Sequence, residues 1–210
     1  MSQIYLEKVR ISFPHLQKPV TMIGSNPVKP QLNATFLVSP DSDNWKKLQT
    51  AITELAKDRW KDEYSVILKN IIMPDKKTRS FGDGEEQKDP KNNYEVRNGY
   101  AGMKWVSAKC HLESDDFLIY DSFGKSVSFK SDSTRYQEEV IKIYGGCYVN
   151  VVLKPYIPKD RKTINFTMKA VQFAAPGEKF GNSEEDVEKH FKPLDIEAPI
   201  FESEGINFDF

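Results

Sequence analysis

Apolar and polar residues alternate with a period of two in six segments of the chain, which predicts β-strands that bury one face and leave the other in water. These segments span residues 8–13, 33–38, 103–112, 118–129, 147–156 and 164–173. In the first segment, Val9, Ile11 and Phe13 are expected to face the core and Arg10 the solvent. Alternation of this kind favours antiparallel sheet, because strands of a parallel sheet are usually apolar on both faces.

Helical spacing and turn signals fill the gaps between these strands. Residues 41–58 are expected to form a helix that packs on the sheet, with apolar residues at helical intervals: Trp45, Leu48, Ile52 and Leu55. Residues 136–143 predict a second, short helix, and the 118–129 segment reads as a hairpin around Ser122-Phe123-Gly124. Residues 19–30 and 74–100 show turn chemistry and no period, so both are expected to be loops.

The order of these elements indicates a mainly β fold. Five or more antiparallel strands with one or two helices and one long loop are typical of a five-stranded Greek-key barrel. The chain has 210 residues and 39% hydrophobic content, enough for one sizeable core. We therefore predict one globular domain over residues 1–182, followed by a flexible tail over residues 183–210.

Charge is distributed unevenly along the chain. Residues 182–210 hold two basic residues, Lys189 and Lys192, against nine acidic ones, a balance of −7. The rest of the chain therefore carries 28 Lys and Arg against 22 Asp and Glu, a balance of +6, although the net charge of the whole chain is only −1. A basic body with an acidic tail suits a polyanionic ligand, but the tail could equally serve only to keep the protein soluble.

Catalytic and metal-binding patterns are absent from the sequence. There is no P-loop, no Gly-x-Ser-x-Gly, no His-Glu-x-x-His and no Cys-x-x-Cys. Cys110 and His111 are consecutive residues of a predicted strand and point to opposite faces, so together with Cys147 they make a poor metal site. We expect no catalytic residues, no metal and no cofactor, and a hydrolase is only a remote alternative. No apolar run approaches the length of a membrane span, so we expect a cytoplasmic protein.

Two predicted strands carry aromatic and basic side chains on their polar faces. One presents Trp105, Ser107, Lys109 and His111, and the other presents Tyr148, Asn150, Val152, Lys154 and Tyr156. Rings stack on unpaired bases and cations neutralise phosphates, so this mixture suits a single strand of nucleic acid. We expect Trp105, Tyr148 and Tyr156 to be stacking platforms, and Arg10, Lys109 and Lys154 to contact phosphates. Alternatively, the rings pack beneath the helix and the cations are simply solvated.

The 74–100 segment also mixes basic and aromatic residues. From it we select Lys77 and Arg79 as candidate contacts to single-stranded DNA. Its formal charge is nevertheless zero, so a solvated flexible loop is an equally good interpretation.

At this point the chain resembles a known family, the tailed-phage single-stranded DNA-binding proteins typified by that of the enterobacterial Enc phage. The resemblance runs over most of residues 7–182. Its matching pieces are Val9-Arg10-Ile11-Ser12-Phe13-Pro14-His15-Leu16, Asn33-Ala34-Thr35-Phe36-Leu37-Val38, Gly82-Asp83-Gly84 and Ile143-Tyr144-Gly145-Gly146-Cys147-Tyr148-Val149. The last strand opens with Thr163-Ile164-Asn165-Phe166 rather than with the family's Gly-Ile-Ser type, so we assign no DNA contact there.

The resemblance implies an OB fold, a preference for single strands, and a role in phage DNA replication or recombination inside the bacterial host cell. The alternatives are an OB-fold protein-interaction module and an RNA-binding module, because neither stacking nor phosphate neutralisation distinguishes RNA from DNA. A homodimer is possible.

The acidic tail is similar to the ends of other bacterial and phage single-strand binders. It closes with Phe208-Asp209-Phe210, which places two rings, a side-chain carboxylate and the terminal carboxylate within three residues. A basic pocket with an apolar floor on a replication or recombination protein could bind this tip. The same charge could occupy the protein's own groove when DNA is absent.

Overall fold

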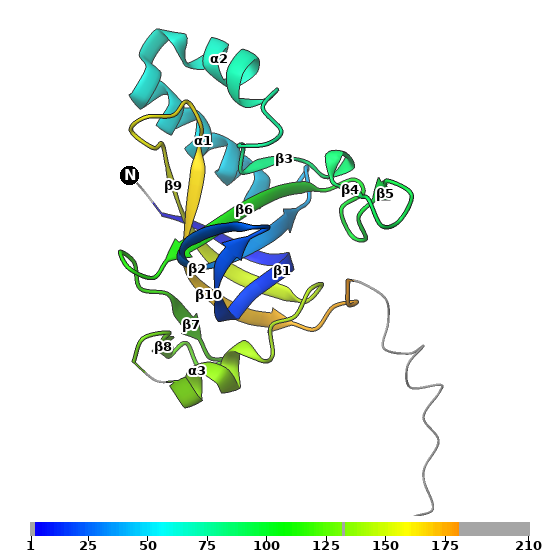
Figure 1. Ribbon diagram of the computed structural model, residues 1–210, viewed down its shortest axis with the longest axis vertical. Helices are drawn as coiled ribbons and strands as arrows, with labels where there is room; N and C mark the ends of the chain where they lie inside the picture. The colour runs from blue at the N-terminus through cyan, green and yellow to red at the C-terminus, as the bar shows by residue number, and fades with distance from the viewer. Residues whose placement is uncertain (1–2, 132, 181–210) are drawn as a thin grey trace, which may run out of the picture.

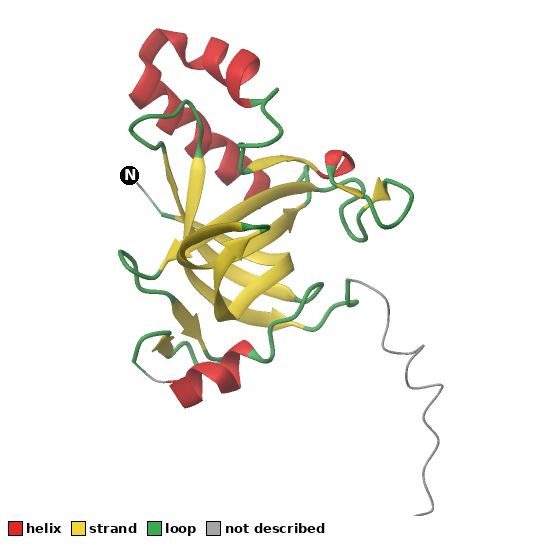
Figure 2. Ribbon diagram, in the orientation of Figure 1, coloured by secondary structure: helices red, strands yellow, loops and turns green. Residues whose placement is uncertain are grey.

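The fold was analysed in a computed structural model, which describes residues 3–131 and 133–180. The predicted tail boundary at residue 182 and the predicted contacts of Phe208, Asp209 and Phe210 lie outside these residues. Strands dominate, with helices at the two ends of the molecule (Figures 1 and 2). The ten strands of the described part are β1 (Ile4–Ile23), β2 (Asn26–Val38), β3 (Phe81–Asp83), β4 (Lys88–Asp89), β5 (Glu95–Val96), β6 (Lys104–His111), β7 (Leu118–Tyr120), β8 (Ser126–Ser128), β9 (Tyr148–Tyr156) and β10 (Asn165–Ala175).

Five of these strands close into a barrel. Their order is β6-β2-β1-β9-β10, and β10 pairs back onto β6 through Thr167 opposite Lys109. This last pairing is parallel, whereas the other four are antiparallel. A five-stranded Greek-key barrel of this kind is an OB fold, so the predicted fold class is confirmed.

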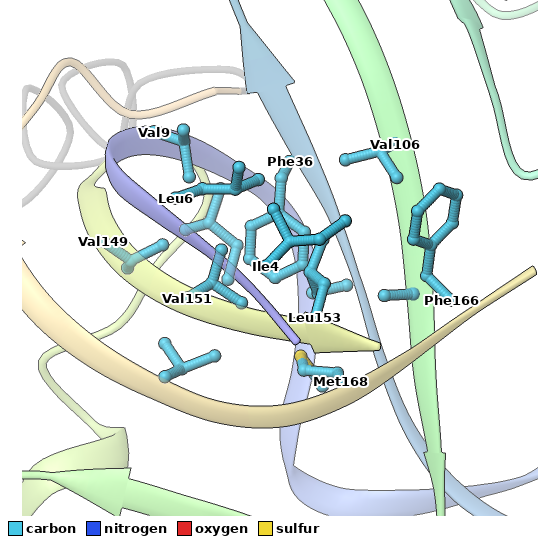
Figure 3. Close-up of a cluster of buried hydrophobic side chains, with 14 of the residues drawn as sticks. Ile4, Leu6, Val9, Phe36, Val106, Val149, Val151, Leu153, Phe166 and Met168 are labelled. Carbon is cyan, nitrogen blue, oxygen red and sulfur yellow. The ribbon is translucent and has the colours of Figure 1, made fainter. Parts of the chain in front are cut away.

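The core fills the inside of the barrel with the inward-facing residues of all five strands. Figure 3 shows side chains from β1, β2, β6, β9 and β10 converging there: Ile4, Leu6, Val9, Phe36, Val106, Val149, Val151, Leu153, Phe166 and Met168. In β9, and in β6 from Val106 on, every second residue is buried, as the alternation predicted. Cys110 and Cys147 belong to this core as unpaired thiols, and the described residues contain no cluster able to hold a metal ion.

Helices lie at the ends of the barrel rather than around it (Figure 2). α1 (Asp43–Trp60) begins after Ser42, whose hydroxyl accepts a hydrogen bond from the Trp45 backbone, and it buries Leu48 and Ile52. It continues through η1 (Lys61–Glu63), α2 (Tyr64–Ile67) and η2 (Leu68–Ile72). At the other end, α3 (Ser133–Val140) buries Tyr136, whose hydroxyl donates to the Leu16 carbonyl at 2.8 Å. None of the described helices is long and apolar enough to cross a bilayer.

Irregularities in the pairing of β1 change which of its residues are buried. The pairing register shifts between Leu6 and Val9 and again between Ser12 and His15. Phe13 lies within the second shift, where it is half exposed and has a φ of 49°. The expectation that Phe13 faces the core is therefore wrong, because an extra residue in a strand reverses the alternation beyond it.

The two segments expected to be loops are partly ordered as strands. Residues 19–30 continue β1 and β2 into a hairpin with Gly24-Ser25 at its turn, and Gly24 has φ of +58°. Proline is tolerated there because this part of the hairpin extends beyond the closed barrel. The 74–100 segment contains β3, which pairs with β6, the turn η3 (Gly84–Glu86) and the β4–β5 hairpin. Strands of two or three residues are too short for their period to be visible in sequence.

Candidate nucleic-acid interface

A groove of about 730 Å³ crosses the outer face of the barrel over β2, β6 and the start of β10. Its floor is polar and uncharged, with Gln31, Asn33 and Thr35 from β2, Ser107 from β6 and Asn165 from β10. Antiparallel pairing places Asn33 opposite Lys109 and Thr35 opposite Ser107, which puts these side chains on one outward face. The floor can therefore donate and accept hydrogen bonds, but it carries no charge of its own.

Cations line the groove and acids do not. Six basic residues contribute to its walls: Lys76, Lys77, Arg79, Arg97, Lys109 and Arg161. Within residues 3–131 and 133–180, no Asp or Glu lines it. Lys109 shows the effect of this imbalance, because burial and the charge of Arg161 both hold its pKa below the usual value. Such a site attracts an anion.

One aromatic ring at the groove is open to solvent. Phe13 is 50% exposed, and the guanidinium of Arg97 lies 5.2 Å from its ring centroid. Its ring could pair with a flat, apolar ligand surface such as a base. Sequence reasoning missed Phe13 because the bulge that turns it outward has no local signal.

Trp105 lines the groove but is not exposed, contrary to expectation. Only 6% of its surface is accessible, and it packs with Leu37 and Tyr100 in a small second core. Its indole nitrogen donates to the Asp83 carbonyl at 3.1 Å. The neighbouring β3 segment covers the ring, so Trp105 forms part of the groove wall and is not available as an open stacking platform.

Arg79 also lines the groove from a buried position. Its guanidinium forms an ion pair with Glu86 and donates to the Met73 carbonyl at 2.6 Å. A Cβ on Gly82 would lie only 3.1 Å from this guanidinium, which shows how closely it packs against β3. Arg79 is thus held by the fold, whereas the Lys77 side chain is exposed at the rim.

Arg10 and Tyr148 lie elsewhere on the barrel, and neither lines the groove. Arg10 donates to the carbonyls of Gly146 at 3.0 Å and of Glu178 at 2.6 Å, and it stacks on the ring of Phe180. Tyr148 lies beside the same guanidinium, 5.7 Å from ring centroid to Cζ. Arg10 therefore holds residues 176–180, here called the C-terminal strap, against the barrel, and the Tyr148 ring lies close to Gly177 of the same strap.

Lys154 and Tyr156 border the groove from β9. Tyr156 pairs with Asn165 of the groove floor, and Lys154 pairs with Thr167, which in turn pairs with Lys109. Lys154 is exposed, while burial raises the pKa of the half-buried Tyr156. These two predicted residues and Lys109 therefore lie together, on the side of the groove formed by β10.

Several groove residues were missed by sequence reasoning. Gln31, Asn33 and Arg161 are ordinary polar residues, and Thr163 and Asn165 open the strand to which no contact was assigned. The only available signal was the run Lys159-Asp160-Arg161-Lys162, which is basic but resembles any solvated loop.

Comparison with known proteins places the chain among phage proteins. A curated relative, "Putative protein p50" of Acyrthosiphon pisum secondary endosymbiont phage 1, is 23% identical over 180 residues, which is 85% of this chain and 86% of the relative. Among solved structures, the single-stranded DNA-binding protein of bacteriophage Enc34 in complex with ssDNA has a TM-score of 0.59 at 24% identity, covering 85% of this chain and 89% of that one.

A second solved structure shares the fold at lower identity. The single-stranded DNA-binding protein gp2.5 of bacteriophage T7 has a TM-score of 0.51 at 13% identity, covering 94% of this chain and 98% of that one. The profile of the family described as "Enterobacter phage Enc34, ssDNA-binding protein" matches residues 2–200. The chain therefore belongs to the single-stranded DNA-binding protein family of Enterobacter phage Enc34.

Proposed function

We propose that this protein binds single-stranded DNA, with little sequence preference, in the groove over β2, β6 and β10. The observation that carries the proposal is a groove with six basic residues and, in the described part of the chain, no acidic one. Membership of a single-stranded DNA-binding family and the fold shared with a protein solved in complex with ssDNA support it.

The groove suggests how a strand would lie. Phosphates would contact the cations of the rim, among them Lys77, Lys109 and Arg161, while bases would turn toward the polar floor and Phe13. A duplex has its base edges paired and stacked inside, so it would gain only the phosphate contacts. Stacking and phosphate contacts depend on ring faces and backbone charge, which all bases and all nucleotides offer, so sequence preference would be slight.

We further propose that the protein acts in phage DNA replication or recombination in the cytoplasm of the infected bacterium. Coating exposed single strands fits a protein that binds them without sequence preference and carries out no chemistry on them. The acidic tail with Phe208, Asp209 and Phe210 would recruit replication or recombination proteins, since its charge and rings suit a basic, apolar-floored pocket on a partner.

A competition titration tests the binding proposal. Purified protein is titrated with a labelled oligothymidine, and unlabelled single-stranded DNA, duplex DNA and RNA compete at several salt concentrations. We expect single-stranded DNA to compete better than duplex DNA, and log affinity to fall with log salt at a slope of roughly −3 if four phosphates are neutralised. A slope near zero, or equal competition by all three nucleic acids, would contradict the proposal.

A further inference from the structure

The β4–β5 hairpin projects from the barrel (Figure 1). We call residues 87–97 the β4–β5 arm. Both ends of the arm belong to the groove, because Gln87 and Arg97 line it, and the Arg97 backbone donates to the Gln87 carbonyl at 2.9 Å. A ligand that fills the groove therefore touches the root of the arm.

Tyr94 presents its ring to water near the tip of this arm. The residue is 68% exposed. Its φ angle is positive, at 58°, as is that of the preceding Asn93, at 47°. A positive φ is unusual for a bulky residue, and it costs free energy that the surrounding structure must offset. Glycine or asparagine would occupy this position with less strain, so the fold does not account for a tyrosine here.

Hydrogen bonds hold the tip in this conformation. The Asp89 carbonyl accepts from the backbones of Asn92 and Tyr94 at 3.1 and 3.0 Å. The Asp89 carboxylate accepts from the Lys91 backbone at 3.0 Å, and Glu95 accepts from the Asn92 side chain at 3.0 Å. The Tyr94 ring is therefore displayed on an ordered turn, which lowers the entropy lost when a ligand stacks on it.

The charges of the arm favour a nucleic acid over an apolar partner. Both carboxylates of the arm, those of Asp89 and Glu95, take part in the hydrogen bonds of the turn. Lys88 and Lys91 are exposed. The arm thus combines an exposed ring with exposed cations, as the groove combines Phe13 with its cations.

Arg97 connects the groove to the arm. Arg97 lies over the ring of Phe13 in the groove, and Tyr94 is three residues from Arg97, about 10 Å along the strand. We propose that bound single-stranded DNA leaves the groove past Phe13 and Arg97 and continues along the β4–β5 arm, where one base stacks on Tyr94. This inference rests on the proposed function, and it makes the DNA site longer than the groove.

Oligonucleotide length provides the test. The affinity of the full-length protein is measured for a series of oligothymidines of increasing length. The series extends below and above the site size of one OB fold, which is about 4 to 16 nucleotides. With Tyr94→Ala we expect unchanged affinity for the shortest oligonucleotides that bind, and a loss of about 5-fold or more for the longest. Tyr94→Phe keeps the ring and should bind like the unchanged protein at every length.

Phe123→Ala is the matched control. Phe123 is 87% exposed on a turn that Asp121 holds by accepting from the backbones of Phe123 and Lys125 at 2.9 and 2.8 Å, yet it belongs neither to the groove nor to the arm. Its substitution should change no affinity. Equal affinities of Tyr94→Ala and the unchanged protein at all lengths, or an equal loss at all lengths, would overturn the inference while leaving the proposed function intact. Failure of the unchanged protein to bind any oligonucleotide would instead overturn the proposed function.

Discussion

Two hollows on the outer surface of the same barrel differ in charge. The groove over β2 and β6 has six basic lining residues and no acidic one in the described part of the chain. The second, here called the apolar hollow, has a volume of about 450 Å³ and crosses β1, β9, β10 and β7. Its floor is a cross-strand row in which Tyr5 pairs with Val152, Val152 with Ala170, and Ala170 with Leu118.

Exposed rings do not distinguish the two hollows. Tyr5 in the apolar hollow is 48% exposed and Phe13 in the groove is 50% exposed. Among the described residues, the apolar hollow contains a single cation, Lys169, which forms an ion pair with Asp115, and it also contains Asp116. In the groove, Lys76 and Arg79 pair with Glu86, but the four other cations form no ion pair within the described residues. This excess of positive charge marks the groove as a site for a polyanion, and concavity with an aromatic ring is not sufficient.

Reversing the groove's charge should have the largest effect on binding. The double substitution Lys109→Glu with Arg161→Glu turns two attractive phosphate contacts into repulsive ones, and we expect affinity for oligothymidine to fall by roughly 100-fold or more at low salt. As a control, Lys46→Glu with Lys47→Glu changes the net charge equally, but on α1, away from the groove. Fluorescence titration should show that this control changes the affinity for oligothymidine by only a few fold. Equal losses in the two variants would mean that overall charge, not the groove, governs affinity.

Substituting the exposed ring of each hollow should show which of the two rings stacks on a base of the DNA. Phe13→Ala is expected to weaken binding by about 5- to 150-fold, the range for loss of one base stacked on an aromatic ring. Tyr5→Ala, at a ring of nearly the same exposure, should leave affinity unchanged. Equilibrium titrations of both variants under the same salt conditions measure the difference, and a reversed order would assign the DNA to the apolar hollow.

Lys109→Met should move binding and stability in opposite directions. We expect about tenfold weaker binding and a salt slope smaller in magnitude by about 0.7, as for one lost phosphate contact. Because the native pKa of Lys109 is lowered, the unfolded chain binds more protons between that pKa and the ordinary value of 10.5, so stability rises with pH in this window.

The variant removes that buried charge. Without DNA, Lys109→Met should therefore raise the free energy of unfolding at neutral pH. The increase of this free energy with pH in the alkaline range should become smaller. Chemical denaturation at neutral and alkaline pH measures both effects. A variant that is less stable at neutral pH than the unchanged protein would show that burial of the charge is not the dominant influence on Lys109.

Arg10→Ala should have the smallest effect on binding. Its guanidinium hydrogen-bonds to Gly146 and Glu178 and stacks on Phe180, so its removal should loosen the C-terminal strap and cost about 1 to 3 kcal/mol of stability. Affinity for DNA, measured well below the unfolding temperature, should change little. A large loss of affinity with full stability would return Arg10 to the DNA-contacting role first expected of it.

Most barrel strands and their buried faces were predictable because alternation is a local property. The sequence identified the inward faces of β6 and β9, the hairpin around Ser122-Phe123-Gly124 and the helix that became α1, each within a few residues. It could not identify β3 or the β4–β5 arm, whose strands are too short to have a period, or the bulge that exposes Phe13. Of the eight predicted DNA contacts, Lys77 and Lys109 line the groove with side chains that are exposed or half-buried. Trp105 and Arg79 line it from buried positions, and Lys154 and Tyr156 border it. Arg10 holds the strap, and Tyr148 lies beside Arg10.

The sequence by itself determined that this chain folds into a β-barrel with a basic body, since burying an alternating apolar face and summing charges need no knowledge of distant neighbours. Only the tertiary structure decided which outward-facing residues share a groove. A polar residue on a strand looks the same in sequence whether its neighbour across the sheet is a cation, an amide or the C-terminal strap. That neighbour is set by strand pairing between residues as distant as Lys109 and Thr167.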